Sequence, residues 1–252
     1  MSNGLSLAPV STRDVAVVIP AYNEQESIAA VITELKQAGF SHLYIVDDAS
    51  TDETIEVAKS TGVTVIPLLR NLGAWKATQT GLRHVYHLGY SQAVTFDADG
   101  QHQASSIQAL LHTQWEQGSD VVIGSCSERG SASRQVAWQY FRMLTGLNIA
   151  DLTSGLRLYN LSALRVLSAN EATMLDYQDL GVLLLLRQAQ LSIAEAKVTM
   201  RQRGDGISRI FSSWRAVIDY MLYSSFLCLS KTSPSNTLKL HSTLKRNVKD
   251  ES

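Results

Sequence analysis

Five short apolar runs in the first half of the chain constrain its fold more than any other feature. They are rich in β-branched residues and lie at 15–19, 43–46, 63–68, 93–96 and 121–123. None of them alternates apolar with polar residues, so we expect strands that are buried on both faces. Amphipathic stretches with helical spacing separate the runs. This alternation predicts an α/β fold with a doubly wound, mostly parallel sheet and helices on both faces.

The helices are predicted from apolar spacing and from expected caps. The first is expected to begin near Glu24, with Asn23 as its N-cap. The next follows Ser50 and Glu53, which have the spacing of a capping box. Further helices are expected at 74–87, 105–116, 134–148 and 177–190, and a half-exposed strand at 194–200.

The length of 252 residues fits one sizeable domain with a small appendage. We expect a flexible N-terminus at 1–12, a main domain at 13–212, an amphipathic helix at 213–230 and a polar, disordered tail at 231–252. The formal net charge of −1 gives no support to nucleic-acid binding.

Cysteine usage and the chain start indicate a cytoplasmic protein. Cys126 and Cys228 form neither a CxxC pair nor a disulfide framework, so both are expected to be reduced, buried thiols. The first ten residues lack the basic start and apolar stretch of a signal peptide. No segment has the roughly 18–20 uninterrupted apolar residues of a membrane span.

A polar cluster follows each of the first four expected strands. The carboxyl ends of parallel strands meet at one edge of a sheet, and ligands bind there in open α/β folds. An alternative explanation is that surface loops are generally polar. General polarity does not explain well why four carboxylates fall within two turns. The clusters are Tyr22-Asn23-Glu24, Asp47-Asp48, Arg70-Asn71 and Asp97-Ala98-Asp99.

Asp97 and Asp99 form the most informative of these clusters. Residues i and i+2 of an extended backbone point the same way, so both carboxylates can face one point. Two carboxylates ~4 Å apart repel by about 4 kcal/mol at an effective dielectric near 20, and a divalent cation removes that cost. Mg²⁺ is commonly held by one or two carboxylates plus substrate phosphates. The turn therefore predicts a metal–diphosphate clamp, and the alternative is an Asx turn that ends the strand.

Asp47 and Asp48 allow two interpretations: capping of the following helix alone, or one cap and one carboxylate facing the binding edge. The chain also lacks GxGxxG after the first strand and lacks GxxxxGK[ST]. These absences argue against a dinucleotide-dependent dehydrogenase and a P-loop enzyme, so a nucleotide site here would need a metal.

Five strings of the sequence resemble family 2 glycosyltransferases of the GT-A fold. They are most similar to polyprenyl-phosphate glycosyltransferases of the dolichyl-phosphate mannose synthase type. The order and approximate spacing of the strings are those of the family, and with a looser match at 198–209 they cover roughly 15–209. The strings are VVIPAYNE (17–24), IVDDASTDET (45–54), NLGAWKATQTG (71–81), DADGQH (97–102) and DLTSGLRLYN (151–160).

The resemblance makes the main domain a GT-A catalytic domain that binds a UDP- or GDP-linked sugar. Asp97 and Asp99, with Gln101 nearby, are implied to hold Mg²⁺ or Mn²⁺ against the diphosphate. Lys76 is implied to frame the donor site, and Arg203 to contact phosphates. The base and ribose are implied to contact Pro20, Tyr22, Glu24, Asp47 and Asp48.

The resemblance also implies inversion at the anomeric carbon, with Asp99, Asp151 and Arg157 as the catalytic residues. A sugar hydroxyl acceptor would need a base, for which Asp151 is the candidate, unless it is a helix N-cap. A lipid phosphate is already ionised and needs cations instead. The candidates for holding it are Arg129, Arg134, Arg157 and Arg209, although the first two also fit a solvated surface.

The acceptor is the less determined substrate. A polyprenyl phosphate in cell-envelope polysaccharide biosynthesis is the main hypothesis, a saccharide hydroxyl the second, and a non-catalytic nucleotide-sugar scaffold the third. Cys126 and Leu156 depart from the family pattern, and Asp176 and Asp179 are ambiguous near the acceptor. The apolar stripe at 213–230 fits packing in a homo-oligomer or peripheral contact with the inner face of the plasma membrane.

Overall fold

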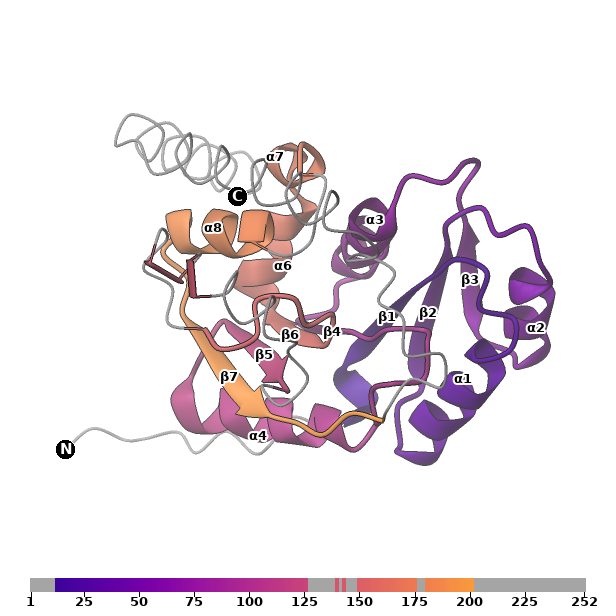
Figure 1. The fold of residues 1–252 in the computed structure, drawn as a ribbon, viewed down its shortest axis with the longest axis horizontal. Helices are drawn as coiled ribbons and strands as arrows, with labels where there is room; N and C mark the ends of the chain where they lie inside the picture. The colour runs from indigo at the N-terminus through magenta and orange to yellow at the C-terminus, as the bar shows by residue number, and fades with distance from the viewer. Residues whose placement is uncertain (1–11, 127–138, 141, 144–148, 176–179, 202–252) are drawn as a thin grey trace.

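A seven-stranded sheet organises the described part of the computed structural model, which comprises residues 12–126, 139–140, 142–143, 149–175 and 180–201 (Figure 1). The strand order is β3-β2-β1-β4-β6-β5-β7. The strands are β1 (Ala16–Ala21), β2 (His42–Asp47), β3 (Thr64–Pro67), β4 (Gln92–Thr95), β5 (Val121–Ser125), β6 (Arg157–Asn160) and β7 (Ile193–Lys197).

The sheet is mostly parallel, as the sequence predicts. Strands β1 to β4 pair in parallel, and so do β5 and β7. Only β6 runs antiparallel, between β4 and β5. In the register of the parallel strands, Ala21 lies beside Asp47, and Asp47 beside Pro67. The carboxyl ends of β1, β2 and β3 therefore meet at one edge.

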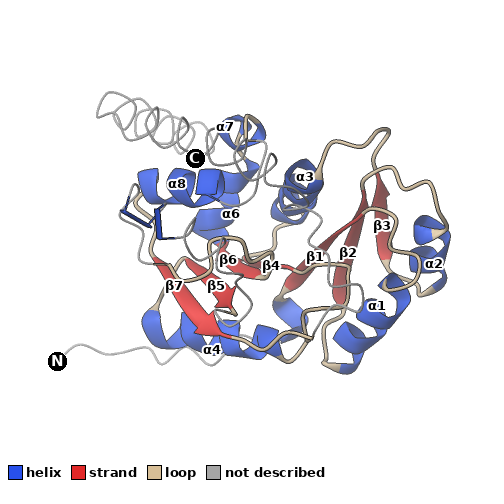
Figure 2. Ribbon diagram, in the orientation of Figure 1, coloured by secondary structure: helices blue, strands red, loops and turns tan. Residues whose placement is uncertain are grey.

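Helices cover both faces of this sheet (Figure 2). One face packs against α1 (Ile28–Gln37), α2 (Thr54–Ser60) and α4 (Ser106–Gln117), and the other against α3 (Ala74–His87), α6 (Leu161–Ser168), α7 (Asn170–Thr173) and α8 (Leu180–Gln188). A short 3-10 helix, η1 (Thr12–Asp14), precedes β1.

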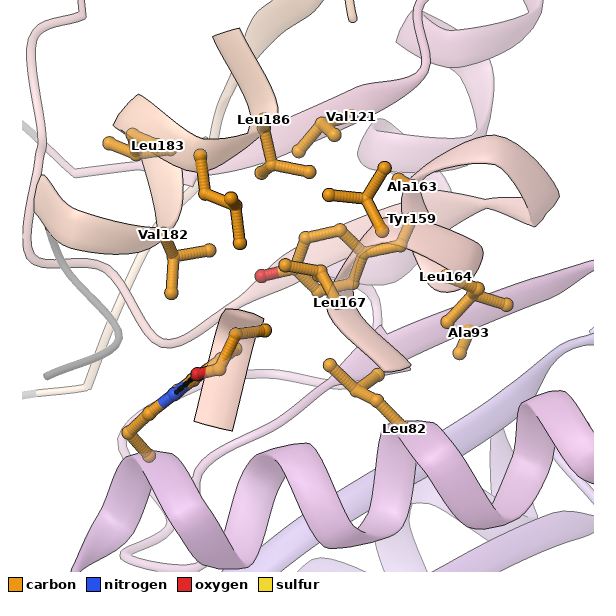
Figure 3. Close-up of a cluster of buried hydrophobic side chains, with 14 of the residues drawn as sticks. Leu82, Ala93, Val121, Tyr159, Ala163, Leu164, Leu167, Val182, Leu183 and Leu186 are labelled. Atoms are coloured by element: carbon orange, nitrogen blue, oxygen red, sulfur yellow. Dashed lines mark hydrogen bonds between the residues drawn. The ribbon is translucent and has the colours of Figure 1, made fainter. Parts of the chain in front are cut away.

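Two hydrophobic clusters, one on each face of the sheet, explain why the strands do not alternate apolar with polar residues. Along β1, Val17 and Ile19 belong to the cluster under α1 and α4, whereas Ala16 and Val18 belong to the cluster under α3 and α6. In the second cluster, the ring of Tyr159 lies among leucines of α3, α6 and α8 (Figure 3). Burial on both faces therefore favours apolar residues at successive positions of a strand.

Two helix starts differ from prediction. Helix α1 begins at Ile28, after an N-cap at Ser27 that makes no side-chain cap bond, rather than near Glu24. Asn23 has a positive φ of 54°, and its side chain accepts a hydrogen bond from the amide of Thr51. The capping box of Ser50 and Glu53 does not form, because Ser50 Oγ accepts from the amide of Asn23. Both polar side chains serve contacts between loops instead of caps.

The second half contains elements that the sequence did not predict. Strand β6 lies in the string at 151–160, which was interpreted only as a motif, and α6 and α7 follow it in a stretch for which no element was predicted. The expected strand at 194–200 ends at Lys197, and the expected helix at 177–190 is described as Leu180–Gln188. Apart from Thr12, the predicted N-terminus (1–12), amphipathic helix (213–230) and tail (231–252) lie outside the described residues, as does most of 134–148.

Candidate functional site

The loops that follow β1 and β2 are joined by hydrogen bonds at the carboxyl edge of the sheet. The amide of Asn23 donates to Ser50 Oγ over 2.9 Å, and the amide of Glu24 donates to Thr54 Oγ1 over 2.8 Å. These bonds hold Glu24 half-buried and leave Tyr22 41% exposed. The expected donor-binding residues of the first two strands therefore share one rigid edge. Pro20 lies within β1 of the same edge, beside Val46.

Asp48 joins this edge to the loop before α3. Its Oδ1 accepts from the amide of Leu72 over 2.7 Å, and its Oδ2 accepts from the amide of Gly73 over 2.8 Å. Both oxygens thus hold the backbone that leads to Lys76, which lies half-buried in the first turn of α3. The capping interpretation of this aspartate is wrong, because both of its carboxylate oxygens accept from a loop 24 and 25 residues further along the chain.

Asp47 has a different environment. It is fully buried, its Oδ2 accepts from the amide of Ser50 over 3.0 Å, and its Oδ1 has no hydrogen-bond partner. It does not cap α2 either: Asp52 Oδ1 accepts from the amide of Thr54 at that helix start. A buried carboxylate oxygen without a partner is costly. Asp47 therefore retains an acceptor that a ligand donor could satisfy.

The acidic turn follows β4 directly. Asp97 and Asp99 are half-buried, whereas Ala98 between them is only 4% exposed, and Ala98 and Asp99 lie in a turn rather than in the extended backbone that was expected. Asp99 Oδ1 accepts from the amide of Gln101 over 3.1 Å. The predicted alternative, an Asx turn, is therefore present at Asp99. It does not exclude metal binding, because a carboxylate offers about four acceptor sites.

Gln101 places a further side-chain oxygen at this turn. Its side chain is buried, and Oε1 has no hydrogen-bond partner. Across the described residues, no group of three or more His, Cys, Asp and Glu side chains could by itself hold a metal ion. Two carboxylates and one amide oxygen nevertheless fit Mg²⁺ or Mn²⁺ when substrate phosphates complete the coordination. The turn is therefore chemically suited to a metal that arrives with a diphosphate.

The loop before β6 packs against the acidic turn. Thr95 Oγ1 donates to the carbonyl of Gly155 over 2.7 Å, and a β-carbon added to Gly155 would lie 2.5 Å from Asp97 Oδ2. The start of this loop is held by Glu195, whose two carboxylate oxygens each accept from the amide of Ala150 over 2.9 Å. The contact between β7, the loop and the turn links three parts of the chain that are distant in sequence.

Asp151 is buried in this loop. Its Oδ1 accepts from both the amide and the hydroxyl of Thr153, each over 3.1 Å. No described helix begins there, so the N-cap interpretation is wrong and an Asx turn takes its place. A carboxylate in this state is engaged in shaping the loop.

Arg157 lies behind the loop with no exposed surface. Its Nε donates to the carbonyl of Ser154 over 2.9 Å, and its Nη2 donates to the carbonyl of Leu152 over 3.0 Å. The same residue influences Tyr159: burial raises the pKa of this phenol, and the nearby Arg157 guanidinium opposes the rise without cancelling it. Direct contact between Arg157 and a substrate would require the guanidinium to leave the loop carbonyls.

Some candidates lie outside the described residues, namely Arg129, Arg134, Arg203, Arg209, Asp176, Asp179 and Cys228. Cys126 is a free thiol that is half-buried at the end of β5, rather than fully buried as expected. His102, Gly155 and Glu195 were not predicted as site residues. The first two lie within the quoted strings DADGQH and DLTSGLRLYN, so those strings contained the only available signal.

Over the described ranges, no helix combines the length and the apolar character that crossing a membrane requires.

A sequence model described as "Glycosyl transferase family 2" matches residues 16–168. A Micrococcus luteus protein named undecaprenyl-phosphate mannosyltransferase is 31% identical over 214 residues, which cover 78% of this chain and 87% of that protein. A Methanococcus voltae protein named UDP-N-acetylglucosamine–dolichyl-phosphate N-acetylglucosaminyltransferase is 29% identical over 72% of this chain and 83% of that protein.

An uncharacterized Methanocaldococcus jannaschii protein is 34% identical over 116 residues, and this chain spans about half of its length (48%). Among solved structures, glucosyl-3-phosphoglycerate synthase from Mycobacterium tuberculosis, in complex with Mn²⁺, uridine diphosphate and phosphoglyceric acid, has a TM-score of 0.59. It is 19% identical over 84% of this chain and 78% of that chain, which establishes a shared GT-A fold. This chain belongs to glycosyl transferase family 2 and is a glycosyltransferase.

Proposed function

We propose that this enzyme is a metal-dependent, inverting glycosyltransferase that moves a sugar from a UDP- or GDP-linked donor to a polyprenyl phosphate in cell-envelope glycan biosynthesis. The observation that carries the proposal is the acidic turn. It combines two half-buried carboxylates, Asp97 and Asp99, with the unpartnered Oε1 of Gln101 at the ligand edge of the sheet. Relatives named for transfer to undecaprenyl or dolichyl phosphate support the acceptor class.

The donor would lie along the carboxyl ends of β1, β2 and β4. Tyr22 offers an exposed ring for a base, and Asp47 Oδ1 is a buried acceptor without a partner. Pro20, Glu24 and Asp48 would complete the base and ribose contacts at the same edge. Lys76 and Arg203 would add positive charge near the phosphates. Asp97, Asp99 and Gln101 would hold the metal against the diphosphate.

The proposed reaction is substitution at the anomeric carbon of the donor sugar. An oxygen of the acceptor phosphate forms the new bond while the bond from the anomeric carbon to the diphosphate breaks. The nucleoside diphosphate leaves with the electron pair of that bond. When bound, Mg²⁺ or Mn²⁺ supplies Lewis-acid stabilisation of the leaving diphosphate. Attack from the face opposite the leaving group inverts the configuration.

The names of two relatives favour a phosphate acceptor over a sugar hydroxyl, because both are named for transfer to undecaprenyl or dolichyl phosphate. A hydroxyl acceptor needs a general base within hydrogen-bond reach, and Asp151 is the candidate for it. Its Oδ1 accepts two hydrogen bonds from Thr153, so Oδ2 would be the atom that takes the proton. A polyprenyl phosphate needs no base because it is ionised at neutral pH. Arg129, Arg134 and Arg209 would supply the cations that hold it.

A donor screen with product analysis tests the function. Uridine and guanosine diphosphate sugars are offered to the full chain with and without Mn²⁺, and binding is measured by calorimetry. Radiolabelled donors are then offered with polyprenyl phosphate or with a saccharide acceptor. Metal-dependent binding and a label that partitions into the lipid phase are expected. Transfer only to the saccharide would overturn the acceptor assignment, and binding without any turnover would indicate a non-catalytic scaffold.

A lipid acceptor also implies contact with the inner face of the plasma membrane. The stripe at 213–230 and the basic residues after it, Lys231, Lys239, Lys245 and Arg246, would provide that contact. Flotation with anionic liposomes tests it in the full chain and after deletion of 213–252. Binding that the deletion abolishes is expected, and failure of the full chain to float would contradict the membrane contact. Mass measurement by light scattering distinguishes the alternative, in which the stripe packs in a homo-oligomer.

A further inference from the structure

We propose that His102 is a positioning residue that sets the orientation of the Asp97 carboxylate for metal binding. The inference rests on the proposed function, because it concerns the same metal site. His102 follows the acidic turn, but it is not one of the oxygen ligands assigned to the metal. Its proposed role is to hold the ligand Asp97 in one orientation through a hydrogen bond.

The contact joins a buried anchor to a partly exposed ligand. Nε2 of His102 lies 3.1 Å from Oδ2 of Asp97, and the histidine side chain has no exposed surface whereas that of Asp97 is 38% exposed. A hydrogen bond to one carboxylate oxygen restricts rotation about the Cβ–Cγ bond, and this rotation decides where the other oxygen points. Loss of this hydrogen bond would remove one restraint on an angle that is intrinsically broad for aspartate.

The second ring nitrogen determines the direction of the hydrogen bond. Nδ1 of His102 is buried and has no hydrogen-bond partner. A proton on Nδ1 would therefore be a buried donor without an acceptor, which is costly. A proton on Nε2 instead has Asp97 Oδ2 as its acceptor. The arrangement thus favours the tautomer in which Nε2 donates to the carboxylate.

The ring of His102 is itself held in place from two sides. The ring centroid of Phe96 lies 5.8 Å away, and the backbone of His102 forms an antiparallel bridge with Met200. Next to the bridge, the amide of Arg201 donates to the carbonyl of Gln101 over 2.8 Å. The segment that follows β7 therefore fixes the histidine relative to the turn.

Glu34 reinforces this attachment from α1. Its Oε2 accepts from Arg201 Nη1 over 2.8 Å, and its Oε1 accepts from the amide of Ala104 over 3.0 Å. Burial would raise the pKa of Glu34, but the hydrogen bonds from Arg201 and Ala104 outweigh it and hold the pKa below its usual value. The turn from Gly100 to Ala104 is therefore supported on both sides of His102.

The consequence is a measurable contribution to metal affinity. Partners that orient a metal ligand typically contribute 10–100-fold to affinity or activity. His102 donates to one ligand only, so we expect its loss to weaken Mn²⁺ binding without abolishing it. Donation of a hydrogen bond, rather than the shape of the ring, is the property that matters.

The test measures Mn²⁺ affinity of the full chain in the presence of UDP and, separately, of GDP, by the electron paramagnetic resonance signal of free Mn²⁺. His102→Gln retains an N–H donor at about the reach of Nε2, whereas His102→Leu removes it. His102→Phe also removes the donor but keeps a ring against Phe96, and it replaces the leucine variant if that variant fails to fold. We expect the Kd for Mn²⁺ to rise roughly 10–100-fold without the donor, and glutamine to restore most of the affinity.

The controls separate this inference from the proposed function. Circular dichroism and thermal unfolding verify that each variant is folded, and Asp99→Asn reports the loss of an assigned ligand. Wild-type affinity in His102→Leu or His102→Phe, beside a weakened Asp99→Asn, would overturn the role of His102 alone. Equal losses in the glutamine and donor-free variants would also overturn it. A folded wild-type chain that binds Mn²⁺ with neither UDP nor GDP would refute both proposals.

Discussion

The backbone of Gly155 lies directly against the carboxylate of Asp97. A β-carbon added to Gly155 would lie 2.5 Å from Oδ2 and 2.7 Å from Cγ of this aspartate, which are distances that real β-carbons essentially never show. The carbonyl of Gly155 accepts from Thr95 Oγ1, so the loop has little freedom to withdraw. Only glycine allows the loop before β6 to approach the acidic turn this closely.

Gly155→Ala should therefore damage the site more than the fold. The added methyl group has to displace the Asp97 carboxylate or the loop, and a misplacement of about 1 Å can cost on the order of 100-fold in rate. We expect a loss of that order in kcat/KM and weaker Mn²⁺ binding. Gly181→Ala in α8 is the matched control, because its nearest neighbour is a flexible Leu175 methyl group at 3.1 Å. Equal metal affinity in the two variants would refute the steric argument.

Asp99→Ala should abolish measurable turnover. The variant removes one of two assigned carboxylate ligands, and the loss of a single transition-state electrostatic contact typically costs 10²–10³-fold. Initial rates with the donor identified by the screen provide the measurement. Asp14→Ala changes an exposed aspartate in η1 and should retain the wild-type rate. A wild-type rate in Asp99→Ala would remove the basis for the metal assignment.

Asp48→Asn should loosen the loop that precedes α3. The amide places an N–H₂ group where one carboxylate oxygen now accepts from Leu72 or Gly73, so one backbone donor loses its acceptor. An unsatisfied buried group costs about 1–3 kcal/mol of unfolding free energy. Chemical denaturation measures that loss, and hydrogen exchange should show faster exchange at these two amides. Glu56→Gln, on the exposed side of α2, is the control, and unchanged exchange in Asp48→Asn would contradict the clamp.

Asp120 should contribute to stability in a pH-dependent manner. Its Oδ1 accepts from Asn160 Nδ2 over 2.8 Å, and its Oδ2 accepts from the amide and hydroxyl of Ser192. Through these bonds Asp120 connects the end of β6 to the start of β7. Burial would raise the pKa of this carboxyl, but the bonds from Ser192 and Asn160 outweigh it and lower the pKa.

A lowered folded-state pKa means that the contribution is complete above the unfolded value of about 3.9 and is lost as the pH falls through the folded value. The difference in unfolding free energy between wild type and Asp120→Asn should thus be largest near neutral pH and shrink below about pH 4. Denaturation at several pH values measures it. A difference that stays constant into the acid range would show that the charge of Asp120 contributes nothing.

The sequence alone determined the elements whose signals are local. Strands β1 to β5 were predicted within one or two residues of their observed bounds, and α3 was predicted as it is observed, Ala74–His87. These predictions succeed because burial on two faces or on one helical stripe is written into neighbouring positions. The binding edge followed from the same pattern, since parallel strands place their carboxyl ends together. The acidic turn and Gln101 were likewise identified from their own string.

Tertiary structure alone decided which side chains support that turn. Asn23 was expected to cap a helix, yet its partner Thr51 lies 28 residues away. Asp48 binds a loop 24 residues further on, and Gly155 reaches Asp97 from a loop that is held by Glu195 of β7. Local patterns cannot encode these choices, because a polar side chain takes whichever partner the fold brings within hydrogen-bond distance. The acidic turn was visible in the sequence, but its support by His102 and Gly155 exists only in the folded chain.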